Sequence, residues 1–151
     1  MSDLYEEDIT LWSERQGALL RRRAAGELVN DTDLDWINIA EEIESLGRSE
    51  RDQLTSRLAV LLAHLLKWRH QPGHRGNSWR LTIVEQRRRA GKLLARNPSL
   101  RPRQDDILAE AYTDALLIAE RETGLPAGTF PARCPWSFEE VLRGDFLSWE
   151  P

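Results

Sequence analysis

The stretch Leu54-Thr-Ser-Arg-Leu-Ala-Val-Leu-Leu-Ala-His-Leu-Leu-Lys-Trp68 decides the fold class, because its apolar residues recur at the spacing of one helix face. The same phase continues toward the amino terminus, so the pattern predicts one long helix from Asp33 or Asp35 to about Arg69. A cap-like pattern at Ser49 leaves open a kink or a division near Gly47. The predicted inward stripe consists of Trp36, Ala40, Ile43, Gly47, Leu54, Leu58, Leu61, Leu65 and Trp68.

Three more long helices are predicted, over residues 3–25, from Asn77 or Ser78 to 96, and over about 102–122. Turn signals separate them, since Gln71-Pro-Gly73 ends the long helix and Asn97-Pro-Ser-Leu-Arg-Pro102 forms the next corner. Residues 124–136 are rich in Pro and Gly, and Ser137-Phe-Glu-Glu140 is a capping box that opens a short helix to about Leu142. The expected fold is therefore all-α: a helical bundle of about four main helices, with a packed carboxy-terminal tail and a short last helix.

The composition is that of a globular protein. Its 151 residues are 40% hydrophobic and 30% charged, which predicts a single domain over residues 1–151. One cysteine, Cys134, excludes an intrachain disulfide and a four-thiolate zinc site, and favours a cytoplasmic location. The apolar runs are far shorter than the ~20 residues that cross a bilayer, so no membrane association is expected.

The net charge of −4 hides a division along the chain. Residues 1–66 carry a net charge of −7, residues 67–103 carry +10, and residues 104–151 carry −7. The third predicted helix presents a basic face, which consists of Arg88, Arg89, Lys92 and Arg96. Such a face is able to meet phosphates, but the sequence pI of about 5.5 and the absence of a nucleic-acid motif favour pairing with the acidic helices.

Several consecutive strings carry a family resemblance. They are Trp36-Ile-Asn-Ile-Ala-Glu-Glu-Ile-Glu-Ser-Leu-Gly-Arg-Ser-Glu50, Leu61-Leu-Ala-His-Leu-Leu-Lys-Trp68, Ser78-Trp-Arg-Leu-Thr-Ile83, Asn97-Pro-Ser-Leu100, Glu122-Thr-Gly-Leu-Pro126 and Cys134-Pro. With these strings the chain resembles the bacterial family catalogued as domain of unknown function 29. The resemblance implies a mainly helical, bundle-like cytoplasmic protein, and it supplies no activity, cofactor or catalytic residue.

A metal site is the first alternative considered, because helical bundles build such sites from inward carboxylates and histidines. Glu41, Glu42, Glu44 and His64 are the candidate ligands, but no Glu-x-x-His spacing occurs. In one continuous helix, twenty residues separate Glu44 from His64, or ~30 Å. We therefore predict no metal and no cofactor, unless a sharp turn at Gly47 brings the two together.

A polar network is predicted beside the core, because Glu50, Arg57 and His64 recur every seven residues along one flank of the long helix. Their expected companions on the third helix are Arg80, Glu85 and Gln86. Such a network sets the register between helices or lines a pocket for a small ligand. The candidate pocket residues are Glu44, Glu50, Arg57, His64, Lys67, Trp68, Trp79, Arg80 and Gln86.

Three functions remain open at this point. The preferred one is a protein-binding or regulatory module, whose partner is an unknown protein or a second copy of the chain. The alternative is a metal-dependent or small-ligand enzyme with a site near Glu44, His64 and Trp79. Nucleic-acid binding by the basic face is third. We also expect Trp68 and Trp79 to meet at the hairpin corner, with a loss of ~3 kcal/mol or more for Trp79→Ala.

Overall fold

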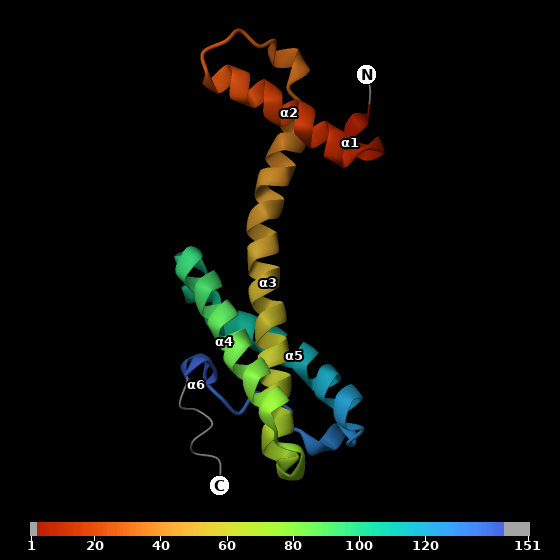
Figure 1. Cartoon of the computed structure of the whole chain (residues 1–151), viewed down its shortest axis with the longest axis vertical. Helices are drawn as coiled ribbons and strands as arrows, with labels where there is room; N and C mark the ends of the chain where they lie inside the picture. The colour runs from red at the N-terminus through yellow and green to blue at the C-terminus, as the bar shows by residue number, and fades with distance from the viewer. Residues whose placement is uncertain (1–2, 144–151) are drawn as a thin grey trace. The chain divides into compact units, whose positions relative to one another are not determined.

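The structure is a computed structural model and describes residues 3–143, which contain six α-helices and no strand. The helices are α1 (Leu4–Glu7), α2 (Ile9–Ala24), α3 (Trp36–His70), α4 (Asn77–Arg96), α5 (Gln104–Thr123) and α6 (Phe138–Leu142) (Figure 1). Four of them are long, which confirms the predicted all-α class. The chain forms two compact units, Met1–Arg48 and Ser49–Pro151, and α3 contributes to both. That all 151 residues make one domain stays a prediction.

The first unit contains a small core beneath α2. Asp8 divides the helix predicted over residues 3–25, because its carboxylate accepts a hydrogen bond from the backbone N–H of Leu11 at 3.0 Å and caps α2. Trp12 is buried, and its indole N–H donates to the carboxylate of Asp35 at 2.9 Å. The buried members of this core are Trp12, Leu34 and Ile39.

The prediction that the whole stripe of the long helix faces inward is wrong for its first half. Trp36, Ala40 and Ile43 are exposed, and Ile39 lies in the core in their place. The cause is the position of α1 and α2. The bond from Trp12 to Asp35, together with a bond of 2.6 Å from the Tyr5 hydroxyl to Glu42, holds these helices on the flank of α3 that carries Ile39.

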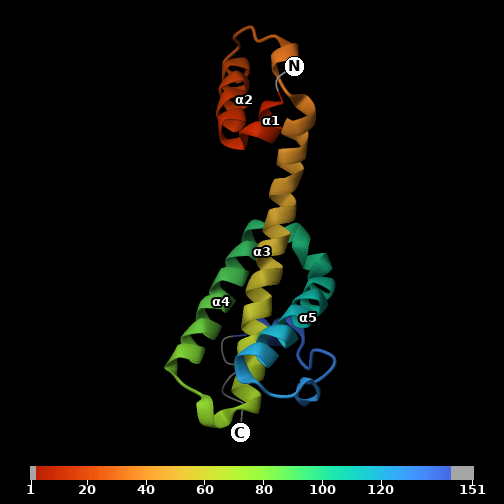
Figure 2. The ribbon, with the colours of Figure 1, turned by 90° about the vertical axis from the view of Figure 1, so that its right-hand side faces the viewer.

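The second unit contains the large core. Figure 2 shows α4 and α5 on either side of the carboxy-terminal part of α3. The second half of the predicted stripe is confirmed, because Leu54, Leu58, Leu61 and Leu65 are almost completely buried. The other helices and the tail close this core with Ile83, Ala90, Leu94, Ile107, Ala111, Phe130, Trp136, Phe138 and Val141. The capping box of Ser137 and Glu140 opens α6 as predicted.

Helix α3 is not divided at Gly47, and it ends at His70 before a 3₁₀ turn over Pro72–His74, as the Pro-Gly signal predicts. Among residues 3–143, no helix is both long enough and apolar enough to cross a membrane.

Candidate functional site

The predicted pocket region contains a buried cation where three helices of the second unit meet. The Lys67 ammonium donates to Oε2 of Glu122, near the end of α5, at 2.6 Å. It also lies 4.8 Å from the centroid of the Trp79 ring on α4. Only 9% of the Lys67 side chain is exposed, against 44% of Glu122, so the cation rather than the carboxylate depends on this contact.

Trp68 and Trp79 each contact a residue of the turn, and no ring contact found within residues 3–143 joins the two, so their expected meeting stays a prediction. The guanidinium of Arg75 lies 5.3 Å from the Trp68 ring centroid, and its Nε–H donates to the Trp68 carbonyl at 2.6 Å. Trp79 stacks on His74, with ring centroids 6.5 Å apart, and it is half-buried. The turn between the helices supplies both contacts.

His64 is engaged within its own helix. Its Nδ1–H donates to the Val60 carbonyl at 2.8 Å, and burial of the ring lowers its pKa below the ordinary value. Glu44 belongs to the Met1–Arg48 unit and is exposed. Within the described residues no three His, Cys, Asp or Glu side chains gather into a set that could hold a metal ion.

Glu50 does form a contact between helices, but with partners other than those expected. It accepts hydrogen bonds from Arg96 at 2.8 and 3.0 Å and from the Asn97 side chain at 2.7 Å, and the Arg96 contact lowers its pKa. Because α3 and α4 run antiparallel about the turn at Pro72–His74, the end of α4 meets the middle of α3, where Glu50 lies. Counting outward from this turn would have found Arg96 from the sequence.

No hydrogen bond found within residues 3–143 joins Arg57, Arg80 or Gln86 to Glu50. Arg80 donates to the Asn77 side chain at 2.7 and 3.2 Å, Gln86 is buried, and Arg57 is half-buried.

The predicted basic face of α4 is partly neutralised. Arg89 pairs with Glu85 at 2.8 Å, and Arg96 pairs with Glu50. Arg88 and Lys92 are exposed, and they lie on the same helix face as two half-exposed apolar side chains, Leu81 and Val84. We call Leu81, Val84, Arg88 and Lys92 the α4 stripe, since their spacing places them on one helix face.

An exposed apolar surface of the first unit combines Leu46 with four positions of the predicted inward stripe, Trp36, Ala40, Ile43 and Gly47. Trp36, Ile43 and Leu46 are 50%, 67% and 65% exposed. With the exposed Ala40 and Gly47 they cover one face of α3, which we call the α3 stripe. Glu44 lies on the flank of this stripe, and it takes part in no ion pair within residues 3–143.

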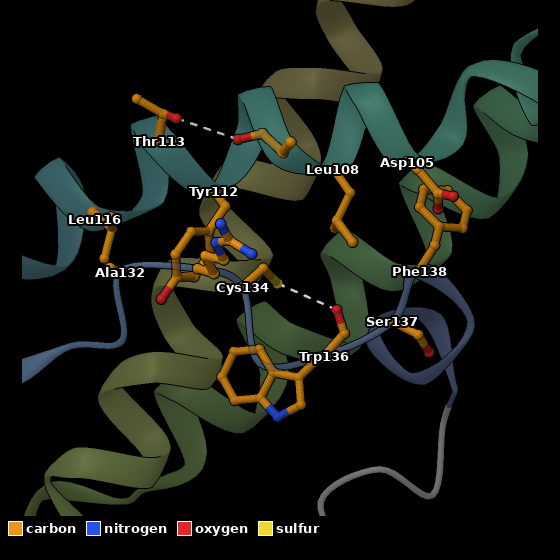
Figure 3. A pocket seen from close by; sticks show the side chains of 12 residues that line it. Asp105, Leu108, Tyr112, Thr113, Leu116, Ala132, Cys134, Trp136, Ser137 and Phe138 are labelled. Atoms are coloured by element: carbon orange, nitrogen blue, oxygen red, sulfur yellow. Dashed lines mark hydrogen bonds between the residues drawn. The ribbon is translucent and has the colours of Figure 1, made fainter.

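A pocket of about 500 Å³ lies between α5 and residues 132–138, and no sequence motif indicated it. In Figure 3, Asp105 and Phe138 lie toward one end, Leu116 and Ala132 toward the other, and Tyr112 lies between them. Side chains of the helix form one wall and the tail forms the other. The sequence did predict that the tail packs on the bundle, but only the folded chain shows that the packing leaves a hollow.

A family model described as Domain of unknown function DUF29 matches residues 4–147 and confirms the resemblance carried by the sequence motifs. No curated protein and no solved structure matches the chain.

Proposed function

Because the chain belongs to the family described as Domain of unknown function DUF29, whose description names no activity, we propose its function from its surface: it is a protein-binding module that associates with a second copy of itself. The observation that carries this proposal is the α3 stripe. Soluble monomers seldom expose contiguous apolar patches unless the patch serves an interaction. A helix face that includes a tryptophan is also the kind of anchor that dominates protein interfaces.

The charge of the first unit selects the kind of partner. Residues 1–48 carry five basic and twelve acidic side chains, a net charge of −7. Glu44 adds a carboxylate beside the α3 stripe that forms no ion pair with any of residues 3–143. A complementary surface therefore needs apolar side chains together with Lys or Arg.

The α4 stripe has this chemistry. Leu81 and Val84 are each 50% exposed, and Arg88 and Lys92 follow them along the same face. In a twofold dimer, the α3 stripe of each copy contacts the α4 stripe of the other, so every contact is made twice. The reciprocal arrangement doubles the buried area, which a stable interface requires.

The test is the oligomeric state of the chain, measured by light scattering after gel filtration and by sedimentation equilibrium. We expect a mass of twice the 17.4 kDa chain that falls to one chain on dilution. Ile43→Ser and Leu46→Ser should each weaken the dimer by about tenfold or more, since each removes a large apolar side chain from the interface. Leu28→Ser is the matched control, because Leu28 is 97% exposed in the same unit but lies outside the stripe.

A charge exchange identifies the two surfaces. Glu44→Lys and Lys92→Glu should each weaken the dimer, and the double variant should recover much of the loss because the attraction is restored with opposite signs. Glu14→Lys makes the same change on an exposed position of α2 and should have little effect. A monomer at every concentration, or a dimer that is indifferent to both stripes, would overturn the proposal.

The other two functions have weaker support. An enzyme site near Glu44, His64 and Trp79 would need the His64 ring, whose Nδ1–H already donates a hydrogen bond to the Val60 carbonyl. Phosphate binding would need the basic face, of which Arg89 and Arg96 already pair with carboxylates. A cytoplasmic location, expected from the single cysteine, is part of the proposal.

A further inference from the structure

We propose that the pocket between α5 and residues 132–138 binds a small apolar carboxylate, with the hydrocarbon body inside and the acid at Arg133. This inference is independent of the proposed dimer, because the pocket and the two stripes share no residue.

The size and walls of the pocket suit a small molecule. Its volume of about 500 Å³ falls within the range of ligand sites, which are concave and mostly apolar. Leu108, Tyr112, Trp136 and Phe138 line it and are themselves buried, so the walls are fixed by the core behind them. Because this apolar wall is rigid before a ligand enters, little conformational entropy is lost on binding.

The polar groups along these walls already have partners. The Tyr112 hydroxyl donates to the Pro131 carbonyl at 2.6 Å, and the Cys134 thiol donates to the Trp136 carbonyl at 3.4 Å. Burial raises the pKa of Tyr112 to about 12 and also raises that of Cys134, so both groups are uncharged at neutral pH. The interior therefore favours a hydrocarbon or aryl body over a polar one.

The charged lining residues decide the sign of the ligand's polar end. Asp105 stands in the first turn of α5, where its carboxylate interacts favourably with the helix dipole. Arg133 is exposed, and it takes part in no ion pair within residues 3–143. A guanidinium binds a carboxylate through two parallel hydrogen bonds, which makes a carboxylate the matching group.

The experiment is calorimetric titration of the full chain with decanoate and, separately, with decylammonium. Both probes share the hydrocarbon body and differ in the sign of the charge. We expect decanoate to bind about fivefold more tightly, the equivalent of about 1 kcal/mol for a partly exposed charge contact. Arg133→Gln should remove this preference and leave the remaining affinity for both probes.

Two further variants separate pocket binding from general adsorption. Ala109→Trp adds an indole at an exposed pocket position of α5 and should block both probes while the circular dichroism melt stays unchanged. Arg121→Gln removes a similar charge from α5 outside the pocket and should change nothing. The proposal is overturned if decanoate shows no binding at concentrations up to about 1 mM. It is also overturned if Ala109→Trp binds decanoate as well as the wild type does, or if the wild type binds decylammonium as tightly as decanoate.

Discussion

The pair of Lys67 and Glu122 should respond unequally to the loss of either partner. Removing the carboxylate leaves a buried ammonium, whereas removing the ammonium leaves a carboxylate that water already reaches. We therefore predict that Glu122→Ala destabilises the protein more than Lys67→Met, although both substitutions break the same 2.6 Å contact.

The magnitudes follow from the exposure of the two side chains. Breaking a fully buried pair costs about 3 to 5 kcal/mol, and the 44% exposure of Glu122 lets water reach the ammonium, so about 2 kcal/mol is expected for Glu122→Ala. Lys67→Met keeps the buried aliphatic stem and removes the cost of burying a charge. It loses the contact with Trp79, worth about 0.5 to 1 kcal/mol, so its total loss should stay below about 1 kcal/mol.

Urea unfolding followed by circular dichroism measures these losses. The double variant should be more stable than Glu122→Ala alone, because no buried charge is left without a partner. Asp114→Ala is the control on the exposed face of α5 and should change the free energy of unfolding by less than about 0.5 kcal/mol. Equal losses in the two single variants, or strict additivity in the double variant, would refute the reasoning.

Three further predictions concern the fold. Leu58→Ala should lower the free energy of unfolding by about 3 to 5 kcal/mol through the cavity it leaves. Ile43→Ala in the α3 stripe should lower it by less than about 0.5 kcal/mol, measured in urea melts of the monomer at low protein concentration. Similar losses in the two variants would contradict the finding that Leu58 is buried and Ile43 is exposed. Since burial lowers the pKa of His64, the unfolded chain takes up a proton more readily, so stability should fall as the pH drops below about 6.5 and through the folded pKa. His64→Gln should reduce this fall, and an unchanged pH profile of the melts would show that His64 does not cause it. Ser137→Ala should cost about 1 kcal/mol by removing the cap of α6, measured by thermal unfolding, and no loss would mean that the capping box contributes nothing.

The sequence predicted the site only in part. Lys67 and Trp79 were expected to lie together, and they do, because both stand close to the turn that joins α3 to α4. The loss predicted for Trp79→Ala now becomes about 2 kcal/mol, because the ring is half-buried and its removal leaves a smaller cavity. The pocket was not predicted, since it is formed by the tail, whose path does not follow a periodic pattern.

What the sequence by itself determined is the helical class, the position of the turns and the buried face of α3 from Leu54 onward. These features depend on the 3.6-residue period and on proline and glycine, which act locally. The same period ran through Trp36 and Ile43, yet these residues are exposed, because a periodic pattern gives the direction of an apolar face and not the presence of a partner. Only the tertiary structure decided this, by placing α1 and α2 on the neighbouring flank through Tyr5 and Trp12.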